Sequence, residues 1–180
     1  MDILRKCADL FSKYIGKKYK FTLDCKLTVN VIFNKNQFHH LIGLQYLTDI
    51  AQVDARKADN STGYIYKQIL KNKITQNTIE RSSFYNEIQK RLNYFLHFDD
   101  IINSKIIIDF DYTKLNTKIM SKYLLYRQFG NVYAIVGLKY SEKYDAFVPE
   151  TFMVEPTDYY IKDQISYNIV DVEFETLKKY

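Results

Sequence analysis

The sequence predicts an α+β fold, in which N-terminal helices and a β-hairpin pack on a C-terminal, mostly antiparallel sheet. Two observations predict this class. Apolar residues recur every three or four positions through most of the first hundred residues, but at every second position from residue 104 onward. Helices and strands are therefore segregated along the chain. The chain of 180 residues, 47% hydrophobic and 26% charged, is expected to form a single domain over 1–180.

The first predicted elements are a helix and a hairpin. Apolar positions spaced by three and four predict a helix over 2–15, and Gly16 supplies its stop. Alternating apolar residues over 19–23 and 27–33, with a short turn between them, predict a hairpin with one buried face.

Helices dominate the next segment. A helix over 37–52 follows turn residues in which Asn34 or Asn36 can act as the cap, and it is apolar nearly all round, which favours a buried position. A polar loop is expected over 54–63. Two more helices are expected, over 64–71 and over 75–98, and Ser83 is a candidate cap within the second range.

The last third of the chain predicts a meander of strands. Gly130-Asn131 is a favourable hairpin turn between two of them, and Pro149 indicates an edge or bulged strand. The predicted strands are 106–108, 123–129, 132–140, 146–154 and 166–174.

Charge and composition narrow the class of function. The net charge of +5 and the pI near 8.9 permit a nucleic-acid partner but fall short of an obligate DNA-coating protein. The 17 Tyr and 12 Phe reflect either the codon usage of an AT-rich genome or a surface on which bases stack. Without a signal peptide or an apolar run of membrane-spanning length, the expected location is cytoplasmic.

Cysteines and acidic residues give little support for a metal. Cys7 and Cys25 lie far apart, and Cys7 falls on the apolar stripe of the first helix, where it is expected to be buried. Asp109 and Asp111 would point the same way on a strand, but no third ligand lies nearby in the sequence. No Walker loop, dinucleotide fingerprint, G-x-S-x-G or H-E-x-x-H occurs.

The three histidines are the groups that titrate near neutral pH. His97 is expected to be solvated. On a continuous helix, Gln45 and Asp49 mark the wet side and His40 lies nearly opposite them, so His40 is expected to point inward. It would then be either a core histidine bonded to a backbone carbonyl, or a general base or acid at the bottom of a cleft.

Several segments resemble one nuclease family. Phe38-His39-His40-Leu41-Ile42-Gly43-Leu44 resembles the F-x-H-L-x-G-L signature of the phage Barnase–EndoU–colicin–RelE-like nucleases, fourth group (PBECR). The resemblance spans nearly the whole chain and keeps its order. The other matching segments are Ile69-Leu70, Lys73-Ile74-Thr75, Ser83-Phe84-Tyr85, Tyr123-Leu124-Leu125, and Phe147 to Phe152 followed by Tyr159 and Gln164.

The resemblance implies a BECR-like fold and ribonuclease activity. Family members are found in phages, mobile elements and toxin systems. The positions that match the family pattern are His40, Gly43, Tyr123, Thr151, Tyr159 and Gln164.

A ribonuclease that uses no metal needs a base for the ribose 2′-hydroxyl, charge stabilisation at the phosphate, and an acid for the leaving oxygen. His40 suits the acid–base role, Thr151 and Tyr123 could donate to the phosphate, and an arginine could bind it through two hydrogen bonds. The predicted catalytic residues are therefore His40, Thr151 and Tyr123, and the predicted substrate-binding residues are Arg91, Arg127, Tyr159 and Gln164.

The expected function is that of a metal-independent ribonuclease, a toxin-like domain of a phage or mobile element. No cofactor and no metal are expected. The expected partners are RNA, single-stranded or a transfer RNA, and a neutralising protein; no membrane partner is expected. The alternative is a catalytically inactive binding protein that inhibits a host or defence factor.

Overall fold

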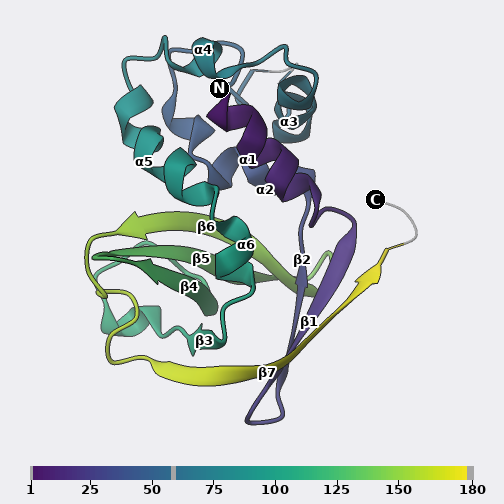
Figure 1. Cartoon of the computed structure of the whole chain (residues 1–180), viewed down its shortest axis with the longest axis vertical. Helices are drawn as coiled ribbons and strands as arrows, with labels where there is room; N and C mark the ends of the chain where they lie inside the picture. Colours follow the sequence, from purple (N-terminus) through teal and green to yellow (C-terminus); the bar gives the residue numbers. More distant parts are fainter. Residues whose placement is uncertain (1, 58–59, 178–180) are drawn as a thin grey trace. The chain divides into compact units, whose positions relative to one another are not determined.

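A computed structural model describes residues 2–57 and 60–177. It confirms the α+β class: N-terminal helices accompany a seven-stranded, mostly antiparallel sheet (Figure 1). The chain divides into two compact units. The helical unit comprises Met1–Ile15 and Asn34–Phe98, and the sheet unit comprises Gly16–Phe33 and Asp99–Tyr180. Among the described residues, no helix is both long enough and apolar enough to cross a membrane.

The helical unit is built around a cluster of aromatic rings. The Phe11 ring lies 5.6 Å from the ring of Phe38 and 5.8 Å from that of Phe98, and Tyr66 donates a hydrogen bond from its hydroxyl to the carbonyl of Ala8. Such ring pairs stabilise beyond the apolar area that they bury. Its elements are α1 (Ile3–Ser12), α2 (Lys35–Leu41), the 3-10 helix η1 (Leu44–Tyr46), α3 (Thr62–Leu70), α4 (Gln76–Ile79), α5 (Tyr85–Phe95) and the start of α6 (Phe98–Ile102).

Two of the predicted helices are divided into shorter elements. The predicted helix over 37–52 is wrong as a continuous element, because Gly43 adopts φ +86° and α2 ends before it. The helix predicted over 75–98 is split into α4, α5 and the start of α6. Ser83 does not cap α5; it donates its backbone N–H and its hydroxyl to Asp49 instead. The cap at Asn34 is confirmed, with a reciprocal bond from its backbone N–H to Gln37.

The sheet unit is a single sheet that closes on itself in the order β1-β2-β6-β5-β4-β3-β7. Among the strand pairs of the described residues, only β2–β6, at Val31 and Phe147, is parallel. The N-terminal hairpin is therefore part of the same sheet as the C-terminal strands. Its strands are β1 (Lys17–Leu23), β2 (Thr28–Ile32), β3 (Ile106–Asp109), β4 (Tyr123–Phe129), β5 (Val132–Ser141), β6 (Ala146–Glu155) and β7 (Ile165–Thr176); the 3-10 helix η2 (Tyr112–Lys114) follows β3.

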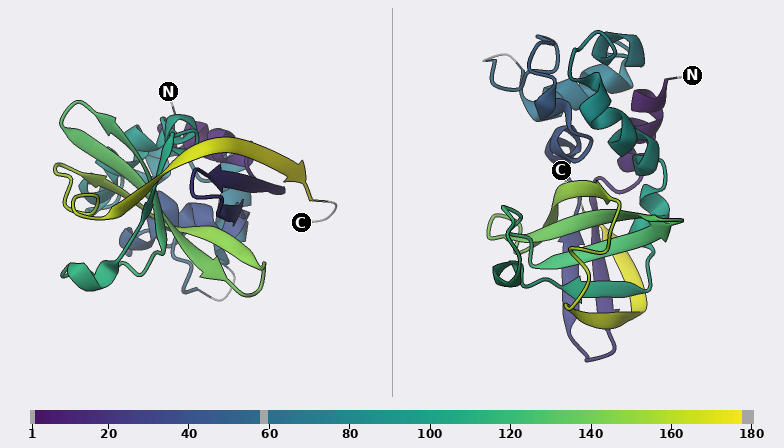
Figure 2. Two further views of the ribbon diagram at one scale, coloured as in Figure 1. Left: turned by 90° about the horizontal axis from the view of Figure 1, so that it is seen from below. Right: turned by 90° about the vertical axis from the view of Figure 1, so that its left-hand side faces the viewer.

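The last strand closes the sheet. β7 is long (Figure 2), and its first part pairs with β3 whereas the rest pairs with β1. On β6, the register shifts so that Pro149 faces Leu138 while Thr151 faces Gly137. Glu150 is the extra residue of this bulge. Of the two alternatives that Pro149 indicated, the bulged strand is the one observed.

We predict that Gly43→Ala destabilises the protein by at least about 2 kcal/mol, from left-handed backbone strain plus steric contact. A Cβ at position 43 would lie 2.8 Å from Cγ2 of Ile88. Gly130→Ala is the matched control, because Gly130 also has positive φ (58°) but open space around its α-carbon. Chemical denaturation should show the smaller loss, about 1 kcal/mol, for the control. Equal losses would contradict a role for the Ile88 contact.

Candidate functional site

The neighbouring histidines of α2 have opposite environments. His39 is 4% exposed, and its Nε2 lies 2.7 Å from the carbonyl oxygen of Val53. His40 is exposed, so the prediction that it points inward is wrong, whereas the exposure of His97 is confirmed. The error arose because Gln45 was placed on the same helix as His40, although the chain turns at Gly43 between them.

His39 therefore takes the structural role that was one alternative for His40. A carbonyl oxygen can only accept, so Nε2 of His39 carries the proton and donates to Val53. Burial lowers the pKa of His39, an effect that the bond to Val53 and the charge of Asp54 oppose in part. His39 is thus held neutral within the helical unit.

His40 belongs to a polar corner between α2 and α5, defined by His40, Gly43, Gln45, Tyr46 and Arg91. The α2–α5 corner is held by two donors to the backbone carbonyl of His40: Nη1 of Arg91 at 3.5 Å and Nε2 of Gln45 at 3.3 Å. That carbonyl lies in the last turn of α2 and also accepts from the backbone N–H of Gly43 at 3.1 Å. The Arg91 guanidinium also lies 5.3 Å from the ring centre of Tyr46, within cation–π range.

The corner brings together two of the predicted site residues, His40 and Arg91. It combines an exposed imidazole, a half-buried guanidinium and the exposed ring of Tyr46. This is a set that can move a proton beside a bound anion. Gln45 and Tyr46 were not predicted as site residues. Their place depends on the left-handed turn at Gly43, which a helical wheel cannot represent.

Thr151 and Tyr123 lie in the sheet unit, on β6 and β4. Thr151 is half-buried opposite Gly137, where its Cγ2 lies 2.8 Å from the place a Cβ of Gly137 would occupy. Tyr123 is 8% exposed, its ring packs edge-on at 5.0 Å from that of Phe147, and burial raises its pKa. Its hydroxyl is therefore kept protonated and able to donate.

The other predicted binding residues occupy two different depressions of the sheet unit. Tyr159 and Gln164 line one of about 340 Å³. Gln164 has a structural role there, because its Oε1 accepts from the backbone N–H of Asp111 at 2.9 Å and its Nε2 donates to the carbonyl of the same residue. Tyr159 is 44% exposed. Arg127 lines a separate depression with Lys105.

The acidic residues considered as metal ligands have other partners. Asp109 pairs with Lys122, and Asp111 accepts from the Thr113 hydroxyl at 2.5 Å. Over residues 2–57 and 60–177, no group of three or more His, Cys, Asp or Glu side chains is arranged to hold a metal ion. Cys7 is buried as predicted, and burial together with Asp2 raises its thiol pKa to about 12, so it stays protonated.

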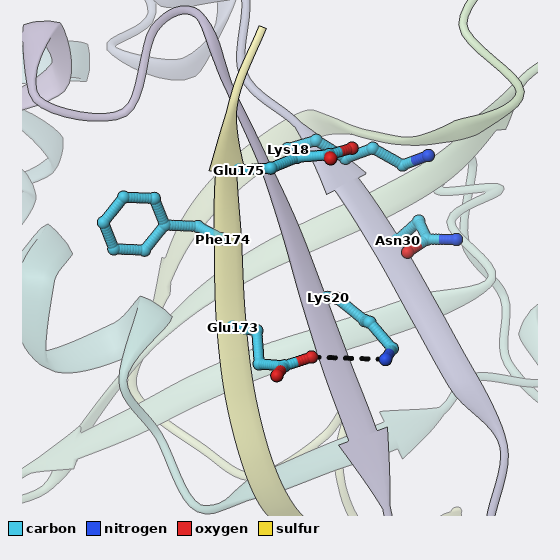
Figure 3. Close-up of a pocket in the computed structure, with 6 residues that line it drawn as sticks. All are labelled: Lys18, Lys20, Asn30, Glu173, Phe174 and Glu175. Atoms are coloured by element: carbon cyan, nitrogen blue, oxygen red, sulfur yellow. Dashed lines mark hydrogen bonds and ion pairs between the residues drawn. The ribbon is translucent and has the colours of Figure 1, made fainter.

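A further depression, of about 400 Å³, lies over β1, β2 and β7 (Figure 3). Its lysines are matched by carboxylates: Lys20 forms an ion pair with Glu173 at 3.2 Å. The Phe174 ring points to the other side of the ribbon from Lys20 (Figure 3). The depression is therefore polar but balanced in charge, which disfavours an anionic ligand.

Comparison with known families gives one match. The sequence model of the family described as phage-Barnase-EndoU-ColicinE5/D-RelE like nuclease4 (PBECR4) matches residues 3–178. That range covers both units and every position of the α2–α5 corner. Comparisons with curated proteins and with solved structures found no match.

We predict that acid weakens the fold through His39. Because its folded pKa is lowered, the unfolded chain binds the proton more readily, and stability falls as the pH drops below the ordinary value of 6.5. Denaturant titrations between pH 8 and pH 5 should show the wild type losing up to about 1.4 kcal/mol per pH unit more than His39→Gln. The glutamine keeps a donor for Val53 but does not titrate. Parallel curves for the two proteins would refute this role.

Proposed function

The chain belongs to the phage-Barnase-EndoU-ColicinE5/D-RelE like nuclease 4 family and is a nuclease-like domain; from this premise we propose that it is a ribonuclease that works without a metal. The observation that carries the proposal is the α2–α5 corner. There the histidine of the family-like signature is exposed, and an arginine is hydrogen-bonded to that residue's own carbonyl. We further propose that it acts as a toxin-like domain of a phage or mobile element, in the cytoplasm.

His40 is the proposed general base. The neutral form of an imidazole can take the proton of a ribose 2′-hydroxyl. The 2′-oxygen then attacks the adjacent phosphorus and the 5′-oxygen leaves. This mechanism requires a 2′-hydroxyl, so it cuts RNA and leaves DNA intact.

Arg91 is the proposed phosphate ligand of the same corner. One of its nitrogens donates to the His40 carbonyl, which places the guanidinium beside the backbone of that residue. Its remaining N–H groups can meet the oxygens of a phosphate, whose negative charge grows during the attack. The stack on Tyr46 limits the freedom of the guanidinium further.

We predict that His40→Ala lowers RNA cleavage by at least about 100-fold, the usual minimum for the loss of a general base. Cleavage of total RNA and transfer RNA by the purified protein is the measurement, and EDTA should have no effect. His97→Ala is the matched control, since it removes an exposed histidine of the same unit. Both exposed sites should tolerate alanine within about 0.5 kcal/mol of stability.

Two outcomes would overturn the enzyme proposal. One is that wild-type protein leaves RNA intact over hours, and the other is that His40→Ala cuts as fast as His97→Ala. In the first case, a binding protein that inhibits a host or defence factor becomes the better hypothesis.

We also propose that the hydroxyls of Tyr123 and Thr151 donate to the phosphate, and we predict that Tyr123→Phe and Thr151→Val each lower cleavage by about 100-fold or more. Both changes keep the shape of the side chain, so packing against Phe147 and Gly137 is retained. Melting temperatures control for a loss of folding. Full activity in a folded variant would show that its hydroxyl takes no part in cleavage.

A further inference from the structure

The depression that contains Arg127 differs in charge from the others described above. It has a volume of about 300 Å³ and is lined by Ser104, Lys105, Ile106, Tyr126, Arg127 and Gln128. Two cations line it, and no carboxylate does. The depression over β1, β2 and β7, the one beside η2 and the one that holds Tyr159 each combine two lysines with two carboxylates.

The two cations come to one depression from neighbouring strands. Lys105 immediately precedes β3, and Arg127 lies on β4, which pairs with β3 through Ile107 and Leu125. Like charges that share a depression repel, and an anion bound between them removes that repulsion.

Neither cation is neutralised within the part of the chain that the structure describes. Lys105 and Arg127 are both exposed, and neither has an ion pair there, in contrast to Lys20, Lys122 and Lys139, which pair with Glu173, Asp109 and Glu150. The neutral donors of the depression are mostly in use: Ser104 donates to Ile106, and Gln128 donates to Gly130.

We propose that Lys105 and Arg127 form a phosphate-binding site for the backbone of single-stranded RNA. Arginine can bind two phosphate oxygens at once, and lysine adds a compact charge. Tyr126 lines the same depression and its ring is half-buried, so it offers an aromatic surface beside the phosphate. The choice of RNA rather than another polyanion rests on the proposed function.

The test uses the full chain and a fluorescent 2′-O-methyl RNA oligonucleotide, which cannot be cut because its 2′-oxygen is blocked. Anisotropy titrations compare the wild type with Lys105→Gln/Arg127→Gln. The matched control is Lys26→Gln/Lys118→Gln, which removes two exposed lysines of the same unit that line none of the four depressions.

The expected result is a loss of affinity of about tenfold or more for Lys105→Gln/Arg127→Gln, and a much smaller loss for the control. The slope of log affinity against log salt should also become shallower by about 0.7, because one phosphate contact to a single strand contributes about that much. Equal losses of affinity in the two double variants would show that RNA binds through the general surface charge, and this would overturn the proposed site.

Two competition experiments identify the class of ligand. At matched ionic strength, inorganic phosphate and polyglutamate should displace the oligonucleotide no better than chloride does. Displacement by phosphate would assign the site to a free phosphate, and displacement by polyglutamate would assign it to acidic chains; either would overturn the RNA assignment.

The binding test is independent of cleavage. If the protein binds the blocked RNA through Arg127 but cuts no RNA, only the proposed enzyme activity fails. If it cuts RNA while Lys105→Gln/Arg127→Gln binds like the control, only the phosphate site fails.

Discussion

The helical unit depends on one left-handed residue. Gly43 ends α2 after two turns and lies so close to Ile88 of α5 that even a methyl group would collide with it. Because the chain at Gly43 packs closely against α5, Arg91 of α5 reaches the carbonyl of His40. Within α2, the two adjacent histidines lie on different faces. His39 is fixed to Val53 in the interior, and His40 is left at the surface beside a cation.

The sheet unit is subject to a different constraint: strands from both ends of the sequence must pair in one closed sheet. A closed sheet leaves few unpaired strand edges. β7 makes the closure by pairing with a strand from the start of the chain and with one from its middle. The bulge at Glu150 accommodates Pro149, which cannot donate to the ladder. The N-terminal hairpin is thereby part of the sheet rather than a layer against it.

The sequence predicted well wherever a local pattern determines the structure. The α+β class, the first helix (although α1 ends at Ser12 rather than at residue 15) and the strands of the C-terminal half all follow from the spacing of apolar residues. The family resemblance was confirmed over nearly the whole chain. Its signature contains His40 and Gly43, which both lie at the α2–α5 corner.

Prediction failed where a single residue changes the chain direction. A helical wheel drawn through Gly43 put His40 on the wrong side, because the wheel assumes one straight axis. The depression that Lys105 and Arg127 share depends on the pairing of β3 with β4, which no local pattern contains. Arg127 could be proposed from its residue type alone, whereas Lys105 could not.

The path of the chain between its two units limits how the protein can be divided. It passes from one unit to the other at residues 15–16, 33–34 and 98–99. A fragment of 34–98 would lack α1 and with it Phe11, the ring at the centre of the aromatic cluster. A fragment of 99–180 would lack both β1 and β2, leaving β6 and β7 with open edges. Neither unit is therefore a contiguous module that a gene could gain or lose by simple fusion, and the two must be inherited and expressed together.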